Sequence, residues 1–325
     1  MKIVISTYAV SDPSHPHFFK QEHLEAIKKS AGEGAEVIAT TDNERAAREA
    51  ADADIIAGFP FSLPPLTGAK NLKWLHAFSA GVDRVLTPET QDLPILISNS
   101  SGIHATPIAE HLLGFMLMFT RGFHKTMRNQ LRHRWEKDET ISELRSKTAL
   151  IAGLGDIGME TARLAHAFGS RVIAVARGTH ERPAFVDELA TADALETLLP
   201  QADFVAICLP HTKKTHHLFN AEKFKIMKPT AVVMNIGRGS IIDERDLIKA
   251  LKNKVIAGAA LDVTETEPLP ADSPLWDMEN VIITPHHSGL SEKYMDRAVA
   301  LFCRNMEAYR KGERLPTMVN KNLGY

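Results

Sequence analysis

The sequence is poor in cysteine and nearly without net charge, and each of these scarcities excludes a class of protein. Its 325 residues include two cysteines, Cys208 and Cys303, which cannot build a disulfide framework or a thiolate metal cluster, so we expect no metal centre. The 38 basic and 40 acidic side chains give a net charge of −2. This balance offers no electrostatic reason to bind nucleic acid or an anionic membrane.

Long hydrophobic runs are also lacking. The most apolar stretch, Leu112–Phe119, is far shorter than the roughly 18 residues that a membrane-spanning helix needs. The apolar run at the N-terminus is too short for the core of a signal peptide. We therefore expect a cytoplasmic protein. The chain length is typical of about two domains, each large enough to bury its own core.

Short β-branched runs alternate with helical patterns along the whole chain, as in parallel sheets covered by helices on both faces. Residues 1–100 contain five expected strands: Lys2–Ser6, Glu36–Ala39, Asp54–Ala57, Trp74–Ala77 and Ile95–Ser98. The helices expected between them include Gln21–Ser30 and Asn43–Ala51, with Asn43 as the N-cap of the second. These elements predict one α/β domain.

A second series of six strands predicts a dinucleotide-binding sheet. The strands are Thr148–Ala152, Arg171–Val175, Phe204–Cys208, Ala231–Met234, Val255–Ala260 and Val281–Thr284, with helices such as Ile157–Phe168 and Glu244–Lys252 between them. A connecting helix is expected over 103–120 and a final helix over 291–310. We assign residues 1–100 plus 290–325 to a discontinuous domain and residues 101–289 to the dinucleotide-binding domain, with the active site at their junction.

The segment Gly153-Leu154-Gly155-Asp156-Ile157-Gly158 has the glycine spacing of a dinucleotide fingerprint. The spacing alone is a weak signal, but here it follows an expected strand directly and opens an expected helix. The first glycine permits the tight turn, the second admits the pyrophosphate, and the third lets the helix pack on the strand. We predict that Gly153, Gly155, Asp156, Ile157 and Gly158 bind the cofactor, with pyrophosphate at the helix N-terminus.

The end of the next strand decides which cofactor is expected. In NAD enzymes an acidic residue here binds the ribose 2′-hydroxyl, but this chain has Ala176 followed by Arg177, with Thr179 nearby. A guanidinium binds a 2′-phosphate through two parallel hydrogen bonds, whereas a carboxylate would repel it. Arg177 could instead be an ordinary surface arginine. We predict a preference for NADP(H), with NAD(H) as the alternative.

Three later strands are followed by a cation, a carboxylate and an imidazole. These are Arg238 within Asn235–Gly239, Glu267 a few residues after Asp262, and His286 within 285–289. Taken singly, each has a simpler explanation: Arg238 as a surface charge, Glu267 as a solvated loop carboxylate and His286 as a structural histidine. Together, at one edge of a parallel sheet, they supply what reduction of a 2-keto acid needs: a cation for the substrate, a proton donor near neutral pH, and a partner that orients the donor.

At these residues the chain resembles the D-isomer-specific 2-hydroxy acid dehydrogenases, and among them the glyoxylate and hydroxypyruvate reductases. Several motifs in order carry the resemblance: Leu75–Asp83, Asn99–Ala105, Ile108–His111, the fingerprint glycines, Leu209–Thr212, Asn235–Gly239, Asp262–Leu269 and Thr284–His286. It implies two Rossmann-like parallel-sheet domains, with a flavodoxin-like substrate domain. It also implies a homodimer formed around the coenzyme domain, with the linking helix and the arm 121–137 at its interface.

The resemblance also implies roles for particular residues. Arg238, Glu267 and His286 would be catalytic, and the backbone N–H groups of Ala80 and Gly81 would bind the substrate carboxylate. Further cofactor contacts are expected at Leu209, Pro210, Thr215, Ile236, Asp262 and His286. From its place after the third strand, the loop Phe59-Pro60-Phe61 is our candidate for a wall that favours short substrates.

The sequence thus predicts an NADPH-preferring reductase of small 2-keto acids that produces D-2-hydroxy acids by hydride transfer. A second hypothesis is a nucleotide-sensing binding protein similar to the transcriptional co-repressors that share this fold and keep the catalytic residues. The balanced charge and the lack of a peptide-docking or disordered tail count against it. Turnover of NADPH with a keto acid distinguishes the enzyme from the sensor.

Overall fold

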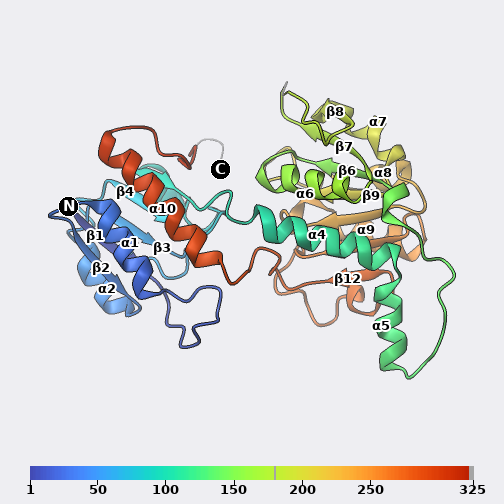
Figure 1. The fold of residues 1–325 in the computed structure, drawn as a ribbon, viewed down its shortest axis with the longest axis horizontal. Coiled ribbons are helices and arrows are strands. Elements are labelled where there is room, and N and C mark those ends of the chain that lie inside the picture. Colours follow the sequence, from blue (N-terminus) through green and yellow to red (C-terminus); the bar gives the residue numbers. More distant parts are fainter. Residues whose placement is uncertain (179–180, 322–325) are drawn as a thin grey trace. The chain divides into compact units, whose positions relative to one another are not determined.

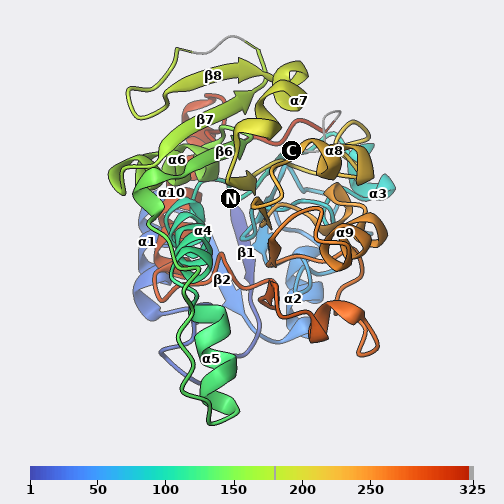
Figure 2. The same cartoon turned by 90° about the vertical axis from the view of Figure 1, so that its right-hand side faces the viewer.

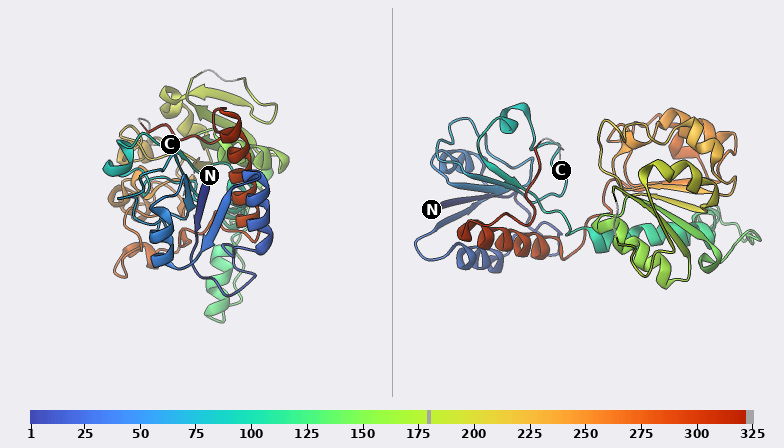
Figure 3. Two further views of the ribbon diagram at one scale, coloured as in Figure 1. Left: turned by 90° about the vertical axis from the view of Figure 1, so that its left-hand side faces the viewer. Right: turned by 90° about the horizontal axis from the view of Figure 1, so that it is seen from above.

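The computed structural model describes residues 1–178 and 181–321. The chain divides into two compact units, Met1–His104 with Leu290–Tyr325 and Ala105–Gly289, and each is described by itself. Both are parallel sheets with helices on their faces (Figures 1 and 3), which confirms the predicted fold class. No helix among the described residues is both long and apolar enough to cross a membrane.

The first unit is built on a five-stranded sheet in the order β2-β1-β3-β4-β5, the flavodoxin-like order. Its strands are β1 Lys2–Ser6, β2 Glu36–Thr40, β3 Ile55–Gly58, β4 Trp74–Ala77 and β5 Leu96–Ser98, and its helices are α1 Gln21–Ala31, α2 Asn43–Ala50, α3 Pro88–Gln91 and α10 Tyr294–Lys311. Helices α1 and α10 lie side by side although they come from opposite ends of the chain (Figure 1). Phe302 of α10 is fully buried against Trp74 of β4, so the C-terminal segment completes the core of this unit.

The second unit is built on a seven-stranded sheet in the order β12-β11-β10-β9-β6-β7-β8. Its strands are β6 Thr148–Ala152, β7 Arg171–Ala176, β8 Glu188–Thr191, β9 Phe204–Ile207, β10 Val232–Asn235, β11 Gly258–Leu261 and β12 Val281–Ile283. Its helices are α4 Ala105–Thr120, α5 Phe123–Leu131, α6 Asp156–Ala167, α7 Leu195–Leu198, α8 Ala221–Ile226 and α9 Glu244–Lys252. The strand order reverses between β6 and β9, and ligands of such sheets bind at this switch point, beyond the carboxyl ends of the strands.

Two expectations about the elements were wrong. The second sheet has a seventh strand, β8, at its edge beside β7 (Figure 2); its side chains are only partly buried, so its sequence lacks the apolar run of a central strand. The N-cap of α2 is Asp42, not Asn43, because the Asp42 carboxylate accepts hydrogen bonds from the backbone N–H groups of Glu44 and Arg45.

Candidate active site

The turn from β6 to α6 has the geometry of a phosphate-binding loop. Gly153 has a φ of +104°, and a side chain there would lie 2.6 Å from the carbonyl oxygen of Cys208. A side chain at Gly158 would lie 1.9 Å from the carbonyl oxygen of Gly153, so helix and turn can approach this closely only with glycine. At Gly155, in contrast, the added carbon would meet open space. Gly153 and Gly158 therefore permit close packing, and Gly155 leaves room in front of the N-terminus of α6.

Asp156 and Ile157 begin helix α6, whose first N–H groups and dipole favour an anion. The residues of this turn therefore fit a dinucleotide pyrophosphate. When bound, a dihydronicotinamide dinucleotide would supply the hydride for reduction of a carbonyl group.

Arg177 lies directly after the last residue of β7 and is exposed, whereas Ala176 is buried. This is the end of the strand next to β6, where the adenosine ribose lies in a dinucleotide-binding sheet. The nearby Thr179, also considered at this position, falls outside the described residues.

The loop after β9 is braced by its own threonines. The hydroxyl group of Thr215 donates to the carbonyl oxygen of Pro210 over 2.7 Å, and the N–H of Thr212 donates to Thr215 Oγ1. The carbonyl oxygen of Leu209 would be 2.5 Å from a side chain at Gly237, so this glycine lets the next loop lie directly against it. Leu209, Pro210 and Thr215 thus belong to one rigid segment at the carboxyl edge of the sheet.

Arg238 follows β10 in a loop that Asn235 organises. Asn235 is fully buried; its amide nitrogen donates to the carbonyl oxygen of Arg238, and its amide oxygen accepts the N–H of Gly237. Ile236 is also buried. A side chain at Gly239 would lie 1.9 Å from the carbonyl oxygen of Thr264, so glycine at this position lets the loop pack against the segment after β11.

Glu267 and His286 form a direct pair. Glu267 Oε2 lies 2.7 Å from His286 Nδ1, and their side chains are 38% and 53% exposed. The other carboxylate oxygen of Glu267 accepts the N–H of Thr264, and Thr264 in turn donates its hydroxyl to the carbonyl oxygen of Thr266. A carboxylate on Nδ1 leaves Nε2 as the ring nitrogen available to a ligand.

Asp262 anchors the turn that carries His286. The side chain is 2% exposed, and its carboxylate accepts hydrogen bonds from the hydroxyl groups of Thr284 and Ser288 and from the N–H groups of His287 and Ser288. Burial by itself raises the pKa of Asp262, but these hydrogen bonds outweigh it, so the pKa lies below its usual value. The carboxylate is thus occupied by the turn, and its contact with a nicotinamide stays a prediction.

In the first unit, the loop after β4 presents two backbone N–H groups. The N–H of Ser100 donates to the carbonyl oxygen of Ser79 over 3.0 Å, and the Asn99 side chain donates to that of Ala80 over 2.6 Å. In a trans peptide the N–H points opposite to the carbonyl group, so the N–H groups of Ala80 and Gly81 point away from 99–100. Neither donates to another group in the part of the chain that the structure describes.

The two aromatic rings of the loop after β3, our candidate wall, differ in exposure. Phe59 is 2% exposed and packs against Tyr8, Phe78 and Tyr294. Phe61, stacked on Phe59 with 5.5 Å between ring centroids, is 60% exposed. Phe59 is therefore a core residue that supports Phe61, and Phe61 is the ring of this loop that a ligand can reach.

The structure brings the predicted catalytic residues of the second unit to one sheet edge, since Arg238, Glu267 and His286 follow the adjacent strands β10, β11 and β12. Ala80, Gly81 and Phe59 lie in the first unit. Sequence reasoning missed the orienting hydrogen bonds of Asn99 and Ser100. The available signal was their place directly after β5, the neighbour of β4.

Comparison with known proteins assigns the family. The model described as "D-isomer specific 2-hydroxyacid dehydrogenase, NAD binding domain" matches residues 113–288. The glyoxylate reductase of Thermofilum pendens is 35% identical over 264 residues, 79% of this chain and 78% of that protein. The chain belongs to the D-isomer-specific 2-hydroxyacid dehydrogenase family. It is accordingly an oxidoreductase that uses a nicotinamide dinucleotide.

Solved structures of the family agree over the whole chain. A family protein from Aeromonas salmonicida has a TM-score of 0.86 at 31% identity and covers 98% of this chain and 99% of its own. The NADPH-dependent glyoxylate/hydroxypyruvate reductase of Sinorhizobium meliloti, solved with NADP and sulfate, has a TM-score of 0.82 at 29% identity and covers 100% and 99%.

Proposed function

We propose that this protein is an NADPH-preferring reductase of small 2-keto acids, of the glyoxylate and hydroxypyruvate class, that forms D-2-hydroxy acids. The observation that carries the proposal is the Glu267–His286 pair, 2.7 Å apart, at the sheet edge where Arg238 also emerges. The names of the Thermofilum and Sinorhizobium proteins support the substrate class. The bulk of the exposed Phe61 ring would favour a short substrate.

Each side chain has a distinct part in this chemistry. Arg238 would bind the carboxylate and the keto oxygen of the substrate, because a guanidinium can hold two oxygens in a fixed geometry. His286 would donate a proton from Nε2 to the oxygen that becomes the alcohol. Glu267, on Nδ1, would orient the ring and stabilise its protonated form. The N–H groups of Ala80 and Gly81 are donors suited to a substrate carboxylate.

The preference for NADPH is supported by Arg177 and by the lack of an acidic residue at the end of β7. A guanidinium here would pair with the 2′-phosphate, and the side chain of Ala176 offers no carboxylate to accept a hydrogen bond from a free 2′-hydroxyl. Structures of relatives with NADP, from Rhizobium etli and Sinorhizobium meliloti, support the same choice, whereas a relative from Lactobacillus delbrueckii was solved with NAD.

We further propose a homodimer that uses helix α5. Phe123, Met127 and Leu131 recur every four residues on this helix and are 51%, 58% and 83% exposed, so they form one apolar face. The guanidinium of Arg128 donates to the carbonyl oxygens of Met278, Glu279 and Val281, which fixes the helix on its unit. An exposed apolar face of this kind is typical of a protein–protein interface.

Steady-state reduction of glyoxylate, hydroxypyruvate, pyruvate and phenylpyruvate, each with NADH and NADPH, tests the function. We expect glyoxylate and hydroxypyruvate with NADPH to give the highest kcat/KM. His286→Asn should lower kcat by about 10²–10⁴-fold, the usual contribution of a positioned acid/base. His166→Asn, at an exposed histidine of the same unit, is the matched control and should leave kcat unchanged.

Four results would contradict the proposal, three of them in part and the last as a whole. Near wild-type turnover by His286→Asn would remove the assigned acid. A clear preference for NADH would contradict the role of Arg177, and a preference for phenylpyruvate would contradict the short-substrate class. Tight NADPH binding without turnover of any keto acid would favour the nucleotide-sensing alternative.

A further inference from the structure

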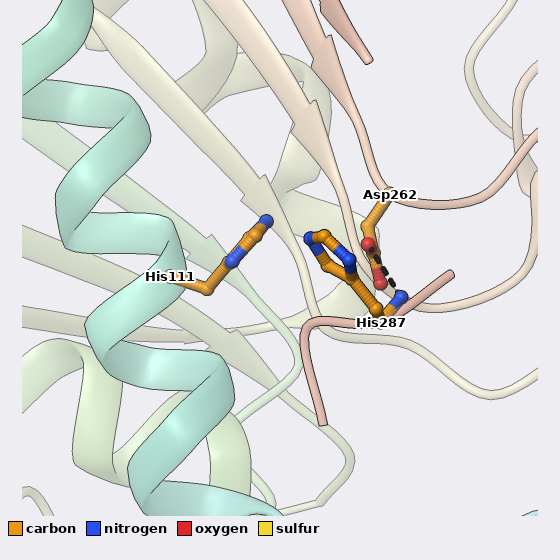
Figure 4. A group of neighbouring side chains, drawn as sticks. All are labelled: His111, Asp262 and His287. Atoms are coloured by element: carbon orange, nitrogen blue, oxygen red, sulfur yellow. Dashed lines mark hydrogen bonds between the residues drawn. The ribbon is translucent and has the colours of Figure 1, made fainter. Parts of the chain in front are cut away.

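A histidine of helix α4 reaches the turn that presents His286. His111 Nε2 lies 3.1 Å from the hydroxyl oxygen of Thr284, and this hydroxyl lies 2.6 Å from Asp262 Oδ1. Figure 4 shows His111 projecting from α4 toward Asp262 and His287. One nitrogen of each histidine and one Asp262 oxygen lie within 4.8 Å of one another. All of these residues belong to the second unit.

The direction of these hydrogen bonds follows from the chemistry of Asp262. Its carboxylate only accepts, so the Thr284 hydroxyl donates to it, and the Thr284 oxygen must accept from His111. His111 therefore carries its proton on Nε2, and the chain of donors runs from His111 through Thr284 to Asp262. The same tautomer argues against a metal ion here, because Nε2 is protonated and the Asp262 oxygens are occupied by Thr284, His287 and Ser288.

Asp262 links these hydrogen bonds to His286 through residues on both sides of it. Its side chain holds Thr284, before His286, and His287 and Ser288, after it, while its backbone carbonyl oxygen accepts the N–H of His286 over 2.8 Å. His286 has a φ of +51°, a conformation that a residue other than glycine keeps only when its surroundings hold it. The Asp262 clamp supplies that restraint.

We propose that His111 is a positioning residue for His286, acting through Thr284 and Asp262. The inference rests on the proposed role of His286 as the acid. His111 is held in place itself, because its ring packs edge-on against Phe115 of the same helix with 4.4 Å between ring centroids. Without the N–H of His111, the Thr284 hydroxyl can rotate away from Asp262, and the turn loses one of its fixed points.

The test compares two substitutions of His111. His111→Phe removes the N–H donor but keeps a ring against Phe115, whereas His111→Gln places an amide N–H near the position of Nε2. We expect His111→Phe to lower kcat by about five- to tenfold, as for the loss of one hydrogen bond, with the KM values for NADPH and keto acid within about twofold. His111→Gln should restore kcat to within about twofold of wild type.

Hydrogen exchange of residues 284–288 provides a readout that needs no turnover. The N–H groups of His286, His287 and Ser288 all donate to Asp262, so their exchange reports on the turn directly. Exchange should rise in His111→Phe and stay at the wild-type level in His111→Gln. His124→Phe is the control: His124 is a buried histidine of the same unit that bonds to the Met118 carbonyl oxygen and not to the turn, so this substitution should lower the Tm without changing kcat or this exchange.

The proposal would be overturned if His111→Phe kept hydrogen exchange and kcat at their wild-type values. It would also be overturned if His111→Gln lowered kcat as much as His111→Phe does. Equal effects of His111→Phe and His124→Phe on kcat would indicate a general loss of stability instead. If wild type turned over no keto acid while exchange still rose in His111→Phe alone, the proposed function would fail and the restraint on the turn would stand.

Discussion

Buried His76 should make the first unit sensitive to acid. His76 is fully buried in β4, beneath the loop that presents the N–H groups of Ala80 and Gly81. Its Nδ1 lies 2.7 Å from the Ser98 hydroxyl, and its Nε2 lies 3.4 Å from the Ser100 hydroxyl. Ser100 donates its own proton to the Ala77 carbonyl oxygen, so His76 Nε2 carries a hydrogen and Nδ1 accepts from Ser98. The site is therefore built for the neutral ring.

The size of the effect follows from the pKa of His76, which burial lowers from 6.5 to about 3. In the unfolded chain the ring takes up a proton below about pH 6.5, whereas in the native unit it stays neutral. This contribution to stability is complete above that pH and is lost as the pH falls toward 3. Each pH unit is worth about 1.4 kcal/mol, so the loss reaches about 3 kcal/mol at pH 4.

The assay is urea unfolding at pH 7 and pH 4, followed by the fluorescence of Trp74. This residue is buried beside Ser98, and Trp135→Phe and Trp276→Phe remove the other two tryptophans, so the signal reports on the first unit alone. His76→Asn keeps an acceptor near Nδ1 but cannot take up a proton. The carboxylates titrate alike in both proteins, so the difference between their pH dependences isolates His76. Parallel losses of stability in the two proteins would refute the reasoning.

Four further outcomes are expected. Gly155→Ala should fold normally but raise the KM for NADPH by about tenfold, since its side chain enters the open space before the helix. Gly158→Ala should instead lower the free energy of unfolding by roughly 1–3 kcal/mol. Equal thermal stability of the two variants would contradict this difference. Arg177→Ala should raise the KM for NADPH about tenfold and leave that for NADH nearly unchanged, and equal changes would argue for a general surface role. Asn99→Ala should raise the KM for the keto acid about fivefold without affecting that for NADPH; an unchanged KM would show that the loop needs no such support. Leu131→Lys should shift the mass measured by light scattering from dimer to monomer, and an unchanged mass would exclude this face as the interface.

Local patterns in the sequence were sufficient for most of the fold. Strands β1, β4 and β6 and helix α9 have the predicted bounds, because each is a short buried run or a strongly amphipathic segment between clear breaks. The edge strand β8 was missed, since a partly exposed strand lacks that pattern. The glycine fingerprint could be read because its steric demands lie within a few residues of each other.

For the candidate site, too, the sequence predicted some features and not others. Residue types and their order after successive parallel strands were enough to select Arg238, Glu267 and His286, because the carboxyl ends of those strands must share one edge. Contacts between segments far apart in the sequence could not be predicted from residue types and their order. Asp262 clamps a turn more than twenty residues later, His111 reaches it from another helix, and Phe59 is buried while Phe61 is exposed. The sequence by itself determined which chemical groups gather at the sheet edge; only the tertiary structure decided which of them hold the others in place, because hydrogen-bond direction and burial depend on neighbours that the chain brings from far away.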